Sequence, residues 1–274
     1  MPLEPFRDRL RKAILVCDGA TGTMLYRRGI SINRCFEELN LSAPDLVLDL
    51  HRTYAAARAD LLETNTFGAN RLKLKTYGLE EQTTAINRRG VELARQAAGD
   101  ALYVAGSIGP TGVKAAQLGT RSETELMALF GEQADALAAA GADLFILETF
   151  QDLDEIVLAI RAVRAVSSLP VIAQMTYDEE GKTTRGVEPE TVVERLLAEG
   201  ADVIGANCSV GPQAMLEVIQ RLARAGAPFI SAQPNAGLPR LVEGRLLYMS
   251  TPEYHAEFAR RFITAGANIV GGCC

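Results

Sequence analysis

Short apolar segments alternate with longer helical patterns along almost the whole chain, and this alternation constrains the fold more than any other feature. The apolar segments have the length and side chains of buried parallel strands, and the segments between them have helical periodicity. The predicted strands cover residues 14–17, 61–63, 102–105, 144–147, 171–174, 203–205, 229–232 and 269–270. The predicted helices cover residues 44–58, 83–98, 123–140, 153–166, 189–199, 213–225 and 252–265.

This order is typical of the (β/α)8 TIM barrel, an α/β fold in which functional groups lie at the carboxyl ends of the strands. An open, doubly wound sheet is the alternative, and it is expected to show a G-x-G-x-x-G fingerprint after its first strand. The turn that follows residues 14–17 has a different glycine spacing, so we predict the barrel. No low-complexity linker or charge block divides the chain, and we therefore expect a single domain over residues 1–274.

A weak repeat accompanies the alternation. A small residue followed by Asp or Asn leads from a helix into the second, fourth, sixth and eighth predicted strands. The glycines in it suit helix C-caps, and the even spacing favours a closed barrel, although ordinary helix-to-strand loops produce the same pattern. The four copies are Arg58-Ala59-Asp60, Gly141-Ala142-Asp143, Gly200-Ala201-Asp202 and Gly266-Ala267-Asn268.

Charge and composition exclude several classes of function. The chain of 274 residues has a net charge of −6, which argues against nucleic acid or an acidic membrane surface as the partner. It has neither an apolar stretch of membrane-spanning length nor a signal-peptide pattern at its start. Five cysteines are an odd number and too few for a disulfide scaffold, so we expect a reducing, cytoplasmic location.

Three cysteines are expected at the carboxyl ends of two strands. Cys208 follows the strand at 203–205, and Cys273 and Cys274 follow the strand at 269–270. Three thiolates that converge there form an open zinc site with one free coordination position, and adjacent cysteines rarely pair in a disulfide. The alternative is that they are buried structural thiols, but the glycines beside them favour metal. We interpret the remaining two, Cys17 and Cys35, as structural.

Polar residues follow other strands at the same predicted edge. Asp18 begins a glycine-rich turn whose backbone N–H groups suit an anion such as a carboxylate, and its own side chain suits an ammonium group or else caps that turn. Glu148 ends the fourth strand and suits either a substrate ammonium group or a neighbouring barrel cation. Asn235 follows the seventh strand, close to the predicted metal. The two histidines, His51 and His255, lie in helical patterns, which disfavours Ser-His and Cys-His mechanisms.

Several motifs together resemble the zinc-dependent homocysteine S-methyltransferase family, and most closely the homocysteine-binding module of cobalamin-dependent methionine synthases. The resemblance covers essentially the whole chain, and the pairing of one cysteine with a distant Gly-Gly-Cys-Cys is its most specific part. The motifs are Asp18-Gly19-Ala20-Thr21-Gly22-Thr23-Met24, Glu37-Glu38-Leu39-Asn40-Leu41, Glu63-Thr64-Asn65-Thr66-Phe67, Gly109-Pro110-Thr111-Gly112, Gly205-Ala206-Asn207-Cys208 and Gly271-Gly272-Cys273-Cys274.

The resemblance implies a Zn²⁺ site in which homocysteine sulfur is the fourth ligand. It also implies that the amino-acid end of homocysteine is held by residues after the first, third and fourth strands. The implied metal ligands and catalytic residues are Cys208, Cys273 and Cys274. The implied substrate contacts are Asp18, Gly19, Ala20, Thr21, Ser107 and Glu148, and we add Asn235 from its predicted position.

The methyl donor is expected to come from outside the chain, because the sequence contains no cobalamin- or folate-binding module. The resemblance implies methylcobalamin on a corrinoid-carrying domain or protein. The alternatives are a stand-alone enzyme that uses S-methylmethionine or betaine, and a non-catalytic zinc-binding module. Family members continue past the double cysteine into a Gly-Thr-Thr-Pro loop and a final helix, whereas this sequence stops at Cys274. A barrel truncated before its last helix and a part of a larger multidomain protein both agree with that ending.

Overall fold

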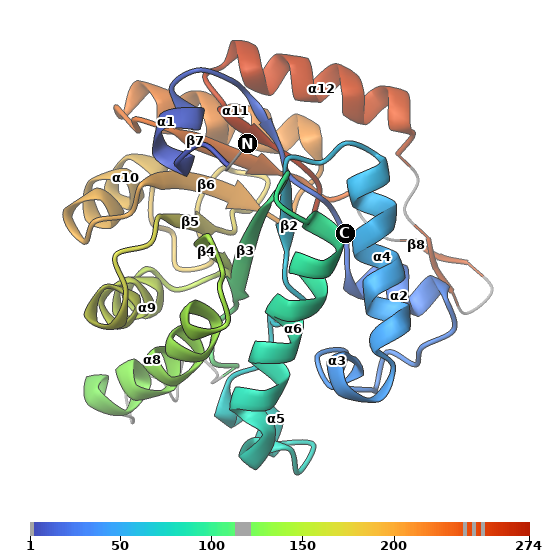
Figure 1. Cartoon of the computed structure of the whole chain (residues 1–274). Coiled ribbons are helices and arrows are strands. Elements are labelled where there is room, and N and C mark those ends of the chain that lie inside the picture. The colour runs from blue at the N-terminus through green and yellow to red at the C-terminus, as the bar shows by residue number, and fades with distance from the viewer. Residues whose placement is uncertain (1–2, 113–121, 238–239, 243–244, 248–249) are drawn as a thin grey trace.

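Eight parallel strands form a barrel surrounded by helices in the computed structural model (Figure 1), which describes residues 3–112, 122–237, 240–242, 245–247 and 250–274. The strand order is β1-β10-β7-β6-β5-β4-β3-β2. A parallel bridge between Cys17 and Leu61 joins the two ends of this sheet and closes the barrel. The predicted (β/α)8 architecture is therefore confirmed. Among the described residues, no helix combines the length and apolar character needed to cross a membrane.

All eight predicted strands are present, and several extend farther towards their carboxyl ends than predicted. The barrel strands are β1 (Leu15–Val16), β2 (Leu61–Glu63), β3 (Tyr103–Ile108), β4 (Leu144–Phe150), β5 (Val171–Met175), β6 (Val203–Asn207), β7 (Ile230–Gln233) and β10 (Ile269–Val270). The seven predicted helices are α4 (Pro44–Ala56), α6 (Thr83–Ala98), α8 (Glu123–Ala139), α9 (Leu153–Val166), α10 (Pro189–Ala198), α11 (Pro212–Arg224) and α12 (Pro252–Thr264).

Short elements that the periodicity did not predict lie in the connections. They are α1 (Phe6–Leu10), α2 (Gly22–Arg27), α3 (Leu39–Ser42), α5 (Arg71–Lys75), the 3-10 turn η1 (Glu80–Gln82) and the antiparallel pair β8 (Arg240–Val242) and β9 (Arg245–Leu247). None is long enough to show a helical or strand period in the sequence. The first of them, α1, adds Phe6 and Leu10 to the apolar cluster inside the barrel, and Phe6 packs edge-on against Tyr103 of β3.

The weak repeat in the sequence has a structural role. In each copy the Asp or Asn forms a pair of hydrogen bonds with one residue of the preceding strand, accepting from its backbone N–H and donating to its carbonyl. Each even strand is thereby joined to the odd strand before it, so the repeat reflects barrel pairing rather than loop chemistry alone. The pairs are Asp60 with Val16, Asp143 with Val104, Asp202 with Val171, and Asn268 with Ile230.

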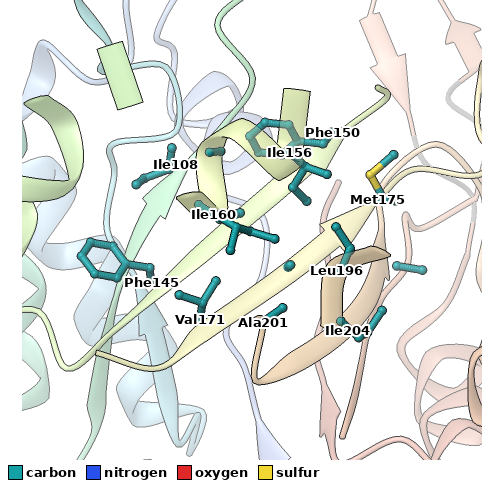
Figure 2. Packing of buried hydrophobic residues seen from close by; sticks show 14 of the residues in the cluster. Ile108, Phe145, Phe150, Ile156, Ile160, Val171, Met175, Leu196, Ala201 and Ile204 are labelled. Atoms are coloured by element: carbon teal, nitrogen blue, oxygen red, sulfur yellow. The ribbon is translucent and has the colours of Figure 1, made fainter. Parts of the chain in front are cut away.

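Side chains that alternate along the strands divide the core into two layers. In β4, Leu144 and Ile146 belong to the cluster inside the barrel, whereas Phe145 and Leu147 face the helices. Figure 2 shows part of the outer layer, where Ile156 and Ile160 of α9 pack on the strands. The outer side of β1 is less well covered, since Val16 is 43% exposed.

Candidate metal and substrate site

Polar side chains replace apolar ones towards the carboxyl end of the barrel interior. Strand alternation decides which residues these are: Glu148 points the same way as Leu144 and Ile146 in β4, and Glu63 the same way as Leu61 in β2. The apolar interior below thus supports a polar mouth above. The inward-facing set at the mouth is Cys17, Glu63, Ser107, Glu148, Gln174, Asn207 and Gln233.

The structure brings Cys208, Cys273 and Cys274 together at this mouth. Their sulfur atoms all lie within 4.8 Å of one another, and the Cys273 and Cys274 sulfurs are 4.0 Å apart. Sulfur ligands of a tetrahedral zinc ion lie about 3.8 Å apart, given a Zn–S bond of about 2.3 Å. Three soft donors at this spacing fit zinc and leave one coordination position open.

Backbone geometry holds the three cysteines in place. Cys208 and Ser209 both adopt positive φ angles of 60°, a conformation that costs non-glycine residues about 1–3 kcal/mol each and turns the chain sharply at the end of β6. A Cβ atom on Gly271 would lie 2.9 Å from the Asp18 carbonyl oxygen, so only glycine allows the last strand to approach the first-strand turn this closely.

The side chain of Asn235 forms hydrogen bonds with two of the three cysteines. Its side-chain Oδ1 accepts a hydrogen bond from the backbone N–H of Cys274 at 3.1 Å, and its side chain also bonds the Cys208 sulfur. The neighbouring Pro234 carbonyl accepts from the Cys273 N–H at 2.9 Å. The loop after β7 therefore fixes both ends of the cysteine set.

The cysteines share their protons unequally. Hydrogen bonds from the Cys273 and Cys274 thiols lower the pKa of Cys208 to about 3, despite its partial burial. The same interaction with Cys208 raises the pKa of Cys273, because that thiol acts as a donor beside an existing negative charge. The interaction among the three sulfurs thus favours the thiolate form of Cys208, which is the form that binds metal.

Three carboxylates lie beside the cysteines: Asp18, Glu63 and Glu148. Asp18 accepts a hydrogen bond from the Glu63 backbone N–H at 3.0 Å, and the Glu63 and Glu148 carboxyl groups hydrogen-bond each other. Within the described part of the chain, none of the three forms an ion pair with Lys, Arg or His. The expectation that Glu148 neutralises a barrel cation is therefore not supported, and the cluster is left with an excess of negative charge.

Burial and mutual repulsion disfavour the charged forms of these carboxyl groups and so raise their pKa values. Desolvation, reinforced by the charge of Asp18, raises the pKa of Glu63 to about 7. Desolvation, reinforced by the charge of Glu63, raises the pKa of Glu148 well above its ordinary value, and desolvation raises that of Asp18 likewise. A bound cation such as an ammonium group relieves this repulsion, so the cluster is suited to an amine.

The other predicted substrate contacts surround the cluster. Ser107 donates a 2.6 Å hydrogen bond to Glu148, which places it behind that carboxyl group. The turn at Gly19, Ala20 and Thr21 is held by Tyr54, whose hydroxyl donates to the Ala20 carbonyl at 2.8 Å. Among the hydrogen bonds of the described residues, none uses the backbone N–H groups of these three turn residues, which are therefore available to a carboxylate.

Glu63, Asn207 and Gln233 are among the mouth residues that were missed as site residues in the sequence. Gln233 donates to Glu63 at 2.7 Å, and Asn207 contacts both Glu148 and Cys273. Each ends a strand with the inward parity, so the rule that identified Glu148 also identifies them. Cys17, expected to pack in the core, lies inside the barrel and contacts Glu63 and Asp18, whereas Cys35 is buried in a separate cluster, as expected.

Comparison with known proteins identifies the family of this chain. A model of the homocysteine S-methyltransferase family matches residues 15–274. The chain is 34% identical to a methionine synthase of Mycobacterium tuberculosis and 33% identical to one of Mycobacterium leprae. In both cases the match covers 97% of this chain and 24% of the relative, so the chain spans about a quarter of their length.

Solved structures agree with this match. The metallated form of the homocysteine methyltransferase MmuM from Escherichia coli superimposes with a TM-score of 0.81 and 27% identity, over 99% of this chain and 95% of that one. The carboxyl transferase domain of Rhizobium etli pyruvate carboxylase, at 16% identity and a TM-score of 0.58, shares the fold alone. The fold, the converging cysteines and the family match agree, and the chain belongs to the homocysteine S-methyltransferase family.

Proposed function

We propose that the chain transfers a methyl group to the sulfur of homocysteine and so forms methionine, with zinc bound by Cys208, Cys273 and Cys274. One observation carries the proposal: three convergent sulfurs lie beside three carboxylates that have no ion-pair partner in the described part of the chain. The first group suits a thiol bound through a metal, and the second suits the amino group of the same amino acid.

Each part of the site has a role in binding. Glu148 and Asp18 hold the ammonium group, Glu63 adds a third acceptor, and Ser107 orients Glu148. The unused N–H groups of Gly19, Ala20 and Thr21 bind the α-carboxylate. Asn235 keeps Cys208 and Cys274 in place through its two side-chain contacts. Homocysteine is thereby fixed at both ends.

The chemistry is a substitution at the methyl carbon. The thiol loses its proton to solvent, its sulfur forms a bond to the methyl carbon, and the bond from that carbon to the donor breaks. Zinc bound at the three cysteines supplies a Lewis acid that stabilises the substrate thiolate at neutral pH. The chain needs no histidine base for this step, in keeping with His51 and His255 lying on the outer helices α4 and α12.

The donor is methylcobalamin presented by another domain or protein. A small sulfonium or ammonium donor calls for an open aromatic face. Phe150 and Tyr177 are buried, and Lys73 covers the Phe67 ring at 4.4 Å, so none of these three offers one. The mycobacterial relatives are about four times as long as this match, which leaves room in them for a donor module.

A stand-alone enzyme that uses S-methylmethionine or betaine is the second candidate function. The observation in its favour is the match to the Escherichia coli homocysteine methyltransferase, which this chain covers over 95% of its length.

We also propose a reducing, cytoplasmic setting, because the metal site requires all three sulfurs as thiols or thiolates.

A parallel methyl-transfer assay tests these proposals. Zinc-loaded protein and homocysteine are incubated with methylcobalamin, S-methylmethionine or betaine, and methionine is measured. We expect slow turnover with free methylcobalamin and faster turnover when a corrinoid module carries it. Efficient use of S-methylmethionine or betaine, with none of methylcobalamin, reverses the choice of donor. Absence of turnover with every donor, together with no effect of homocysteine on a Co²⁺-substituted site, shows a non-catalytic metal module.

A further inference from the structure

The Asn207 side chain contacts both the cysteine set and the carboxylate cluster. It is 1% exposed and ends β6 directly before Cys208. Its Nδ2 group lies 3.8 Å from the Cys273 sulfur and 3.4 Å from Glu148 Oε2. These are long contacts, so the amide lies between two acceptors without a full hydrogen bond to either.

A third contact holds the amide at this point. Nδ2 donates to Thr149 Oγ1 at 2.8 Å, and Oδ1 accepts from the Thr149 backbone N–H at 2.8 Å. Thr149 follows Glu148 and has a positive φ of 62°, which matches the positive φ of Cys208 on the other strand. Asn207 therefore joins two strained backbone positions, one at a cysteine after β6 and the other beside a carboxylate within β4.

An amide NH₂ group has two hydrogens, and here they face three acceptors: Thr149, Glu148 and Cys273. With one hydrogen committed to Thr149, the second goes to either the sulfur or the carboxyl group. An ionised sulfur attracts it more strongly than a thiol does. Glu148 then loses a competing donor and becomes a better acceptor for a substrate amine.

We propose that Asn207 is a positioning residue that couples the two halves of the site, so that zinc at the cysteines increases the affinity of the carboxylate cluster for an amino acid. The inference rests on the proposed function, because it assumes that the cysteines bind zinc and the carboxylates bind the amine. Coupling is reciprocal, so an amino acid at the cluster also stabilises bound zinc.

The probe is L-norleucine, which has the shape of methionine but no sulfur to bind the metal. Its dissociation constant is measured by calorimetry with zinc-loaded and zinc-free protein. For the unaltered chain we expect zinc to tighten binding about fivefold, the lower end of typical coupling between two sites. In Asn207→Ala the ratio of the dissociation constants without and with zinc should fall to about one, because the amide that both halves of the site contact is absent.

Asn87→Ala is the matched control. Asn87 is also fully buried, but it lies on α6, outside the mouth. Its side chain donates hydrogen bonds to the backbone carbonyls of Ala69 and Thr83. The Asn87→Ala variant should be less stable than the unaltered chain and should keep the fivefold ratio of norleucine dissociation constants. If Asn207→Ala does not fold, Asn207→Leu replaces it, since its side chain fills a similar volume but has no hydrogen to donate to either acceptor.

The outcomes separate this inference from the proposed function. An unchanged ratio in the Asn207 variants, with norleucine still bound, refutes the coupling role alone. A ratio of one in the unaltered chain does the same. Failure of the unaltered chain to bind norleucine at all refutes the assignment of the carboxylate cluster to the amine, and this inference with it.

Discussion

The two ends of the barrel interior use the same strands for opposite purposes. In β4, Ile146 lies in an apolar layer with no exposed surface, and Glu148, two residues later on the same side, lies among carboxylates that repel one another. The lower layer gains free energy from burial, whereas the upper layer keeps groups whose charged forms are destabilised in the absence of ligand. The residues that stabilise the fold and the residues that bind the ligand are thus neighbours on the same face of the strand. This is expected where destabilised groups in a binding site are held by a well-packed apolar core.

Removal of one metal ligand should give the largest effect at the mouth. Cys208→Ser or Cys273→Ser should lose bound zinc and reduce kcat/KM by more than about 100-fold, since loss of groups merely supporting a metal already costs about 10–100-fold. Metal analysis and the methyl-transfer assay measure this. Cys17→Ser and Cys35→Ser are the controls and should retain zinc. Full zinc content in either ligand variant contradicts the assigned site.

The lower layer should respond in stability alone. Ile146→Ala removes a fully buried side chain and should lower the free energy of unfolding by about 2–5 kcal/mol, as measured by denaturant titration. Its zinc content and its KM for homocysteine should remain those of the unaltered chain at temperatures where it is folded. Val166→Ala, at a residue 43% exposed, is the control and should change stability by less than about 0.5 kcal/mol. A large change in KM for Ile146→Ala contradicts the separation of the two layers.

Much of the lower layer was predictable from sequence, and less of the upper one. Each strand carries a dense apolar segment, so all eight were found. The short elements α1, α2 and α3 were missed because tertiary contacts, not periodicity, define them.

At the mouth, residues directly after an apolar segment were recognised, among them Cys208 and Glu148. Strand parity also marks Glu63 and Asn207, but it does not show their neighbours from other strands: Gln233 and Glu148 for Glu63, and Glu148 and Cys273 for Asn207. Those proximities follow from barrel closure and register, which a single sequence does not show. The Asp and Asn residues of the weak repeat, at the amino-terminal end of the strands, show the same limit. Their pattern was visible in the sequence, but their hydrogen-bond partners were not.

Glu148→Gln tests whether the upper layer reads the amine. Loss of the charge should weaken homocysteine binding by about 30-fold, roughly 2 kcal/mol, because a partly buried ammonium loses a charged partner. Binding of 4-mercaptobutanoate, which keeps the thiol and carboxylate but lacks the amino group, should change little. Affinities measured for both thiols give the comparison. Equal weakening of the two shows that Glu148 does not contact the amine.

The smallest predicted effect concerns the pH dependence contributed by Glu63. Its pKa is raised to about 7, so its contribution to stability is fully present below its ordinary value of about 4.5 and is lost as the pH rises to about 7. Substrate binding has the opposite dependence, because the amine is held best by ionised carboxylates. Stability of the unaltered chain should therefore decline between about pH 5 and 8, while L-norleucine affinity rises several-fold over the same interval.

Glu63→Gln should reduce both trends while preserving the structure around residue 63. A glutamine carbonyl still accepts the hydrogen bond from Gln233, which is 2.7 Å long in the unaltered chain, but it does not ionise. Denaturant titrations and norleucine calorimetry at a series of pH values measure the two slopes. Glu38→Gln, which removes a carboxylate paired with Arg34 at the surface, is the control and should keep both. If Glu63→Gln retains the full slopes, the proton is held elsewhere in the cluster, and the opposition between stability and binding at the mouth does not depend on Glu63.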